Sequence, residues 1–277
     1  MNKKNSLQMV LLEMMKEFHE FCVENDISYY MLGGTMIGAI RHKGFIPWDD
    51  DIDIGIPRKD YEKLLSIDKS KLPTNLEIIS YKNNKKYPFA FAKLFNKNTT
   101  LIENTTNGLI GGVYIDLFPI DGGGVNRKIA KYHFKLIKLN NSFLWFSQNN
   151  DETIGIKKYV KAIAKFIGVD FWQKLIDKVL KLYSYEKSNY IGNLLGLYNE
   201  KEIVPKSYFG TPKLYEFEDT KFYGMEKYDE YLKNIYGDYM KLPPIDKQKS
   251  HHKIAYLDLN LPYSKYKQNL KKRDIST

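Results

Sequence analysis

The segment from Trp48 to Gly55 constrains the fold more than any other part of the sequence, because four aspartates fall within five positions there. These acids are Asp49, Asp50, Asp51 and Asp53, and isoleucine occupies positions 52, 54 and 56. Like charges at this density repel one another, so the fold must offset the repulsion or a cation must neutralise it. The alternation of acid and isoleucine predicts a strand, on which residues two apart face the same side. We therefore expect Asp51 and Asp53 to project together while the isoleucines face the core.

Two parallel carboxylates are the kind of oxygen donor that Mg²⁺ requires when substrate phosphates complete its octahedral shell. Other interpretations of the segment are a solvated acidic turn, capping of the following helix and a calcium-binding loop. An acidic turn gives no reason for the interleaved isoleucines, and a cap employs one acid instead of four. A calcium loop fits poorly, because its sixth and twelfth positions are Ile54 and Asp60 in place of Gly and Glu.

A second candidate element is the Gly-Gly-Thr segment that follows a predicted strand. Gly33, Gly34 and Thr35 stand between a predicted strand at 27–32 and a short predicted helix at 36–41. Glycines there let backbone amides approach a phosphate, although such a pair before a helix is more often a simple turn.

Asp116 lies inside the apolar segment 113–118, which reads as a strand. A buried acid is costly unless it is paired or bound to a cation. It is either the partner of a structural ion pair, for which Arg41 is the candidate, or a third carboxylate beside Asp51 and Asp53. In the second case it binds metal or removes a proton from an acceptor hydroxyl.

The other predicted elements follow from apolar periodicity and turn residues. An amphipathic helix begins after Ser6 and ends near Asn25, and Asp121 to Gly124 is predicted to be a loop. The remaining predictions are strands at 52–56, 76–81, 89–95, 99–103 and 221–223, and helices at 57–65, 226–236 and, in several pieces, 127–198.

This pattern predicts an α/β (α+β) fold with a mixed sheet core flanked by helices and interrupted by a helical insertion. We expect a catalytic core at residues 1–124, a helical insertion or subdomain at 125–205 and a C-terminal segment returning to the core at 206–277. The lone Cys22 excludes a disulfide framework and any multi-cysteine zinc site. The apolar stretch at 7–12 is predicted to be a structural helix and not a signal peptide, and no run of about 18 apolar residues predicts a membrane span.

The net charge is +10, from 43 basic and 33 acidic residues, and 39 of the basic residues are lysine. A dedicated nucleic-acid reader would use more arginine for bidentate contacts, so no nucleic-acid partner is expected. We interpret most of the positive charge as lysine side chains on solvent-exposed surfaces. Much of the excess falls between Lys128 and Lys181, where lysine alternates with Ile, Phe and Trp, and this region is expected to lie against anionic lipid.

In this order, the Gly-Gly-Thr turn, the Asp-x-Asp pair and the later strand acid are similar to the nucleotidyltransferase superfamily. More specifically, the segment from Met31 to Gly55 strongly resembles the LicD family. So do the segments Tyr114 to Asp121 and Tyr236 to Pro244, the latter followed by two histidines. The resemblance runs from about residue 20 to 260 and is weakest at 125–205. Near Tyr223 the spacer before the Tyr-Gly helix is shorter than usual, which bears on the acceptor side of the site.

The resemblance implies a nucleotidyltransferase-like fold in which Asp51, Asp53 and Asp116 are catalytic and hold Mg²⁺, with Mn²⁺ as the alternative ion. It implies transfer of phosphocholine, or a related alcohol phosphate, from CDP-choline or another CDP-alcohol, with release of CMP. The acceptor would be a hydroxyl of a lipid-linked cell-surface glycan precursor such as teichoic acid. Eukaryotic relatives of the fukutin type use CDP-ribitol.

The remaining candidate site residues fall into two groups. Candidates for phosphate or nucleotide contacts are Gly33, Gly34, Thr35, Arg41, His42 and Lys93. Candidates for choline or acceptor contacts are Trp48, Asp49, Asp50, Asp121, His251 and His252.

Two other functions stay open from the sequence. One is an NTP-dependent nucleotidyltransferase that releases pyrophosphate, and the other is a non-catalytic lysine-rich binding protein. The expected location is cytoplasmic, with peripheral contact at the inner face of the plasma membrane as a further expectation.

Overall fold

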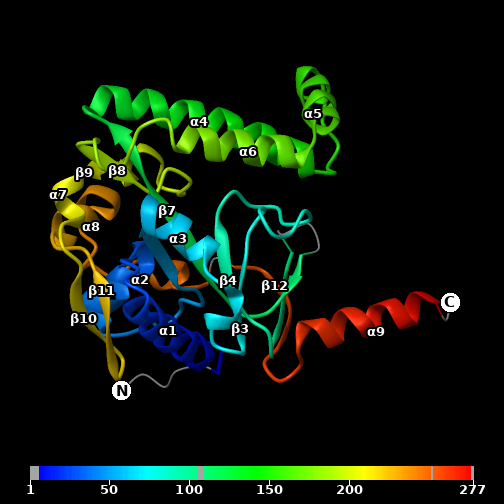
Figure 1. Ribbon diagram of the computed structural model, residues 1–277, viewed down its shortest axis with the longest axis horizontal. Helices are drawn as coiled ribbons and strands as arrows, with labels where there is room; N and C mark the ends of the chain where they lie inside the picture. Colours follow the sequence, from blue (N-terminus) through cyan, green and yellow to red (C-terminus); the bar gives the residue numbers. More distant parts are fainter. Residues whose placement is uncertain (1–5, 105–108, 251, 276–277) are drawn as a thin grey trace.

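The computed structural model describes residues 6–104, 109–250 and 252–275, and the side chains as far as residue 270 (Figure 1). A mixed sheet carries helices packed against it, and the helices α4 (Arg127–Gln148) and α6 (Val169–Leu180) lie side by side at one end (Figure 1). This arrangement confirms the predicted α+β class.

The main sheet is built around one long strand, β7 (Tyr114–Gly124), whose residues are almost all buried. Among the described strands of this sheet, β2 (Asp53–Pro57) runs parallel to β7, and the other strand pairs are antiparallel. β8 pairs with the far end of β7, and β9 pairs with β8. From one edge of the sheet, five strands lie side by side in the order β1 (Tyr30–Met31), β2 (Asp53–Pro57), β7 (Tyr114–Gly124), β4 (Ala92–Asn96) and β3 (Leu76–Ile79). The two strands outside this order are β8 (Tyr190–Gly192) and β9 (Val204–Pro205).

The other strands form a small sheet in the order β12 (Ile254–Asp258), β5 (Thr100–Glu103), β6 (Ile110–Gly111) and a hairpin of β10 (Lys213–Phe217) and β11 (Thr220–Gly224). The helices are α1 (Ser6–Glu24), α2 (Gly33–Ile37), α3 (Arg58–Ser66), α4 (Arg127–Gln148), α5 (Ile156–Ile167), α6 (Val169–Leu180), α7 (Lys206–Phe209), α8 (Tyr228–Tyr236) and α9 (Tyr263–Ile275). A π-helical turn (Gly38–His42) follows α2, and 3₁₀ turns cover Lys69–Lys71, Asn199–Glu202 and Ile245–Lys247.

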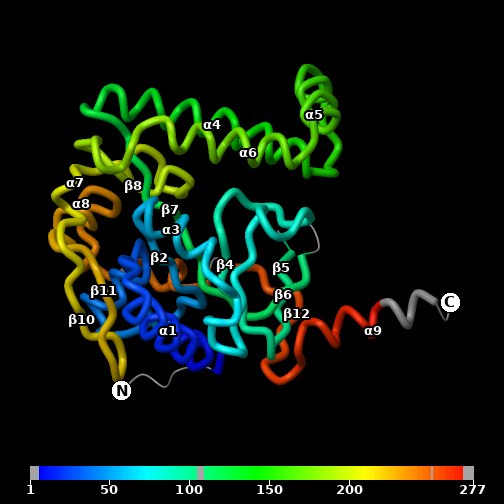
Figure 2. Tube along the Cα trace, in the orientation of Figure 1, coloured from blue at the N-terminus to red at the C-terminus, as the bar shows by residue number. Residues whose placement is uncertain are grey.

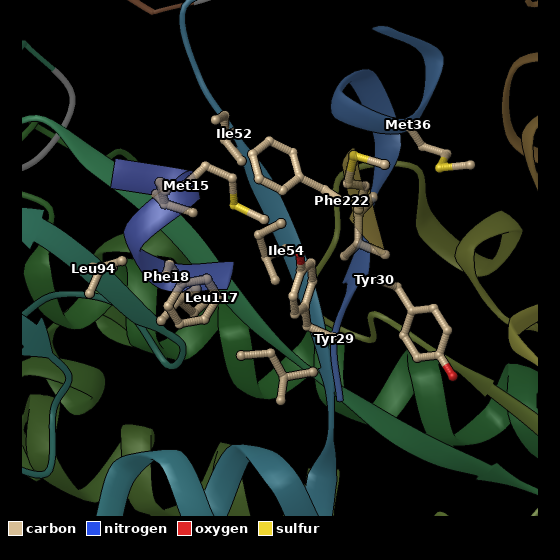
Figure 3. Packing of buried hydrophobic residues seen from close by; sticks show 14 of the residues in the cluster. Met15, Phe18, Tyr29, Tyr30, Met36, Ile52, Ile54, Leu94, Leu117 and Phe222 are labelled. Atoms are coloured by element: carbon tan, nitrogen blue, oxygen red, sulfur yellow. The ribbon is translucent and has the colours of Figure 1, made fainter. Parts of the chain in front are cut away.

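The isoleucines between the aspartates face the core, as predicted. Ile52, Ile54 and Ile56 are at most 1% exposed. Met15 and Phe18 of α1 lie beside Ile54 (Figure 3). Burial of each such side chain stabilises the fold by about 1.5–3 kcal/mol, which fixes the strand on which the acids stand.

The prediction of a loop at Asp121 to Gly124 is wrong, because these residues form the end of β7 and pair with β8. A Cβ on Gly122 would lie 2.4 Å from the carbonyl oxygen of Tyr183. The glycines therefore serve close backbone approach inside a sheet, a use that the sequence does not distinguish from a turn.

The predicted helical run at 127–198 is confirmed as far as Leu180 and wrong beyond it, since β8 lies in the remainder. Helices α4, α5 and α6 share an apolar cluster that also includes Leu194 and Ile203. The strand predicted at 27–32 is reduced to β1, and β10, β12 and α9 have no counterpart among the predicted elements.

A buried arginine ties the helical region to the sheet. Arg58, the first residue of α3, is 9% exposed and places its Nε and Nη2 atoms 2.7 and 2.5 Å from the two carboxylate oxygens of Asp121 on β7. Its Nη1 atom lies 3.1 Å from Oδ1 of Asp177 on α6. Burial disfavours the charge of Arg58, but Asp121 and Asp177 outweigh burial and raise its pKa.

We expect Arg58→Ala to lower the free energy of unfolding by about 3–5 kcal/mol, because it leaves the buried carboxylate of Asp121 without its partner and removes one of the ion pairs of Asp177, whose other partner is Lys181. Urea denaturation monitored by circular dichroism measures this loss. The exposed Arg127→Ala provides the matched control, with a change within about 0.5 kcal/mol. A loss below about 1 kcal/mol in Arg58→Ala would contradict a structural role for this network.

Candidate active site

A cavity of about 720 Å³ opens beside the first residues of the parallel strands β2 and β7. Its walls come from both strands, the segment before β4, the end of α4, the loop after β8 and helix α8. The predicted site residues among its lining are Gly33, Asp51, Asp53, Asp116 and His252.

The three predicted acids meet at this cavity because of the strand register. Asp53 begins β2 and stands opposite Asp116 of β7 in the parallel pairing. Asp51 lies two residues earlier, just outside the strand, and also lines the cavity. The alternation read from the sequence therefore put the acids and the isoleucines on the correct sides.

Lys93 is the buried cation of the site. It stands opposite Asp116 in the antiparallel pairing of β4 and β7, and its Nζ atom lies 2.5 Å from Oδ1 of Asp116. Both side chains are buried, at 3% and 9% exposure. The suggested ion pair between Asp116 and Arg41 is wrong, since Arg41 Nη1 donates to the carbonyl oxygen of Tyr239 at 2.5 Å.

Negative charge exceeds positive charge around these acids. Burial, followed by the charges of Asp51, Asp116 and Asp49, raises the pKa of Asp53 well above its usual range. Burial also raises the pKa of Asp116, although Lys93 opposes this. Burial and the neighbouring Asp51 raise the pKa of Asp49 to about 8. A hard divalent cation would relieve this repulsion, so the donor set fits Mg²⁺ or Mn²⁺.

Gly33, Gly34 and Thr35, predicted to precede a helix, instead begin α2 and pack directly against the acids. Gly33 has φ +46°, which favours glycine, and a Cβ there would lie 3.1 Å from the hydroxyl of Tyr236. A Cβ on Gly34 would lie 2.9 Å from Oδ2 of Asp49. The backbone N–H of Asp53 donates to Oγ1 of Thr35 at 2.9 Å, so Thr35 helps to position the first residue of β2.

Asp50 and His252 form a second polar group at the rim. The ligand atoms of Asp50, Asp51 and His252 all lie within 4.8 Å of one another. However, His252 Nδ1 is 3.0 Å from Oδ1 of Asp50, and this hydrogen bond raises the pKa of His252 to about 9. Burial disfavours ionisation of Asp50, but hydrogen bonds from His252 and Ser250 outweigh it and lower its pKa. The other ring nitrogen of His252, Nε2, lies 3.8 Å from Oδ2 of Asp51, so the imidazole contacts both acids of this group.

The other predicted contacts lie elsewhere. His42 and Trp48 form a ring contact with centroids 6.3 Å apart, and neither lines the cavity, nor does Arg41. Asp121 is wrong as a choline or acceptor contact, because it is 1% exposed and bound to Arg58. His251 lies outside the described residues.

Several lining residues were not singled out by sequence reasoning. Phe89, Phe91 and Phe118 form an aromatic wall, and Tyr231 and Tyr236 come from α8. Tyr236 begins the segment from Tyr236 to Pro244 that resembles the LicD family, so the sequence did contain a signal for it. Glu202 also lines the cavity, and no spacing or motif in the sequence marks it.

The chain is similar in sequence to known proteins. Residues 26–147 match the family model described as LicD/FKTN/FKRP, nucleotidyltransferase domain. The chain is 33% identical over 258 residues to the lipopolysaccharide cholinephosphotransferase LicD of Haemophilus influenzae, covering 88% of this chain and 94% of that protein.

Shorter matches include an uncharacterized protein of Rickettsia prowazekii, 50% identical over 50 residues that cover 18% of this chain and 19% of that protein. The human ribitol 5-phosphate transferase FKRP is 47% identical over 34 residues, which cover 12% of this chain and 7% of that protein. The extent of the match to the Haemophilus protein shows that this chain belongs to the LicD family. The prediction of a LicD-like transferase is therefore confirmed.

Proposed function

We propose that this protein transfers phosphocholine from CDP-choline to a hydroxyl of a cell-surface glycan precursor, such as teichoic acid, and releases CMP. The observation that carries the proposal is the convergence of Asp51, Asp53 and Asp116 on one cavity in a chain related over most of its length to a cholinephosphotransferase.

Asp51, Asp53 and Asp116 would hold Mg²⁺ or Mn²⁺. An ion bound there would neutralise the negative charge of the diphosphate as the phosphoanhydride bond breaks. In this proposal the acceptor oxygen attacks the choline-bearing phosphorus, the bond from that phosphorus to the CMP oxygen breaks, and a cavity carboxylate takes the hydroxyl proton. Asp116 supplies that base or a metal ligand, and its ion pair with Lys93 fixes its position.

Positive groups at the cavity would orient the donor phosphates. His252 lines the cavity and its raised pKa leaves it protonated at neutral pH. Thr35 acts through Asp53, whose backbone amide it binds, and thereby positions a proposed ligand. Gly33 leaves room for the tyrosines of α8 beside the acids.

The acceptor would arrive on a lipid carrier, and one surface of the protein suits a peripheral membrane contact. The chain runs out along α4, turns through α5 and returns along α6 (Figure 2). On α5 the apolar side chains Ile156, Tyr159, Ile163 and Phe166 are 81%, 71%, 56% and 93% exposed. An exposed apolar face of this size marks an interaction site.

Charge selects anionic lipid as the partner of this face. Residues 127–181 contain twelve basic and four acidic residues, which account for most of the net charge of +10. Helix α5 has four lysines and no acid. A helix with apolar residues on one side and lysines on the other binds at the surface of a bilayer. No helix among the described residues is both long and apolar enough to cross the membrane.

The same region reaches the cavity. Trp145 near the end of α4 lines the cavity and is 56% exposed. Asn150 and Asp151 also line it, and they bind Lys165 and Lys161 of α5. A bilayer against α5 would therefore present a lipid-linked acceptor near the cavity mouth.

We expect Asp53→Asn to lower the rate of CMP release by about 10²–10³-fold, since removal of one group that stabilises transition-state charge costs about 3–4 kcal/mol. The assay measures CMP formed from CDP-choline in the presence of a purified glycan precursor. Asp246→Asn, at an exposed position outside the cavity, is the matched control and should retain the wild-type rate. Release of pyrophosphate from CTP, with no CMP from CDP-choline, would instead identify a nucleotidyltransferase.

Mg²⁺ at about 100 times its dissociation constant is expected to raise the free energy of unfolding of the wild type by about 2.7 kcal/mol. Thermal unfolding with Mg²⁺, and again after addition of EDTA, measures the effect. Asp53→Asn should show a much smaller shift. An equal shift in both proteins would place the ion elsewhere.

We expect Phe166→Asn to weaken binding to vesicles of phosphatidylcholine and phosphatidylserine roughly 10-fold or more, because an exposed phenylalanine gains about 1.5–3 kcal/mol on burial. Vesicle co-sedimentation measures the binding. Ile245→Asn, which removes an 87% exposed apolar side chain elsewhere, is the control. Unchanged binding in Phe166→Asn, or equal binding to purely zwitterionic vesicles, would exclude this surface as the lipid contact.

A further inference from the structure

We infer that Glu202 and the tyrosines beside it form a subsite for the quaternary ammonium group of the donor alcohol. This inference rests on the proposed function, because it assigns one part of the same cavity to one end of the donor. It also explains a buried acid that the transfer chemistry at β2 and β7 does not use.

Glu202 ends the 3₁₀ turn Asn199–Glu202 and is 5% exposed. One of its carboxylate oxygens accepts a hydrogen bond from the backbone N–H of Tyr198 at 2.9 Å. Its carboxylate presses so closely on the loop after β8 that a Cβ on Gly196 would lie 1.9 Å from Oε1. The loop conformation therefore holds the acid at the cavity wall.

No cation neutralises this carboxylate within the part of the chain that the structure describes. Burial accordingly raises the pKa of Glu202 to about 7, and the Tyr198 amide lowers it only in part. A buried carboxylate without a countercharge is unfavourable, so a cationic ligand would gain from meeting it.

The surroundings of Glu202 indicate which cation fits. Tyr198 and Tyr236 are in edge-on contact, with ring centroids 4.6 Å apart, and Tyr231 and Leu195 also line this end of the cavity. A primary ammonium would need several hydrogen-bond acceptors here. A trimethylammonium group has no N–H and needs only negative charge and aromatic faces.

Two tyrosines connect this subsite to the reacting end of the cavity. Tyr231 and Tyr236 line the same cavity as Glu202 and Asp53. The ring of Tyr236 contacts Tyr198, while a Cβ on Gly33 would lie 3.1 Å from the Tyr236 hydroxyl and 3.8 Å from Oδ2 of Asp53. A donor whose diphosphate lies at the strand acids would thus extend its alcohol toward Glu202.

The aromatic wall of Phe89 and Phe91 is a poorer place for a cation. Lys93 Nζ already lies 5.0 Å from the ring centroid of Phe89 and 5.6 Å from that of Phe91. A second positive charge there would be repelled by the lysine. The carboxylate end of the cavity is therefore preferred.

The test compares a cationic and a neutral donor. For wild-type protein we expect kcat/KM to be at least 10-fold higher with CDP-choline than with CDP-glycerol. Glu202→Gln, which keeps the shape and removes the charge, should lower kcat/KM for CDP-choline roughly 10- to 100-fold and leave that for CDP-glycerol unchanged. Glu200→Gln is the matched control, because Glu200 is two residues away and forms an exposed ion pair with Lys131.

An equal effect of Glu202→Gln on both donors, or no effect on either, would overturn the subsite. If Glu202→Gln fails to fold, Tyr198→Leu should show the same selective loss and Tyr198→Phe should not. Absence of CMP release from every CDP-alcohol by the wild type would instead contradict the proposed function.

In that case isothermal titration with phosphocholine and with glycerol 3-phosphate tests the subsite by itself. Support requires that wild-type protein prefers phosphocholine at least 10-fold and that Glu202→Gln, or Tyr198→Leu in its place, loses the preference. Equal binding of both phosphates by the wild type, or an unchanged preference in the variant, would overturn it.

Discussion

The repulsion among the aspartates at the start of β2 is the interaction on which the rest of the site depends. Strand pairing places Asp53 next to Asp116, and Lys93 next to Asp116, so a single buried lysine faces several buried or half-buried acids. The isoleucines between the acids and the cover of α1 hold the strand in place despite this repulsion. The resulting excess of negative charge would attract a divalent cation, and that cation would in turn attract the phosphates of a diphosphate substrate.

Strand β7 carries two acids with different surroundings. Asp116 and Asp121 are five positions apart, and residues an odd number apart on a regular strand point to opposite faces. Asp116 lines the cavity, whereas Asp121 binds Arg58 and links β7 to α3 and α6. The ion pairs of Arg58 thus hold the helical region against the sheet, and the end of α4 and the loop after β8 reach the cavity from that region.

The two ends of this assembly differ in charge. Acids gather where the strands begin, and lysines gather on the helices between α4 and α6 together with exposed apolar side chains. In the proposed function a phosphate-bearing donor belongs to the first region and a lipid-borne acceptor to the second. The positive net charge of the chain comes mainly from the helical region, whereas the acids at the cavity make the local charge there negative.

The sequence by itself determined the α+β class, the strand of alternating Asp and Ile, and the gathering of Asp51, Asp53 and Asp116, which line one cavity, because period-two alternation and a specific motif are local properties. It misjudged Asp121 to Gly124 and the partner of Asp116, because a glycine that admits a neighbouring strand looks the same as a glycine in a turn, and ion pairing depends on register. Only the tertiary structure brought Glu202 and the tyrosines of α8 to the same cavity. These residues lie about 150 positions or more from Asp51 and Asp53, and at least 86 positions from Asp116, so nothing short of the folded chain sets their distance.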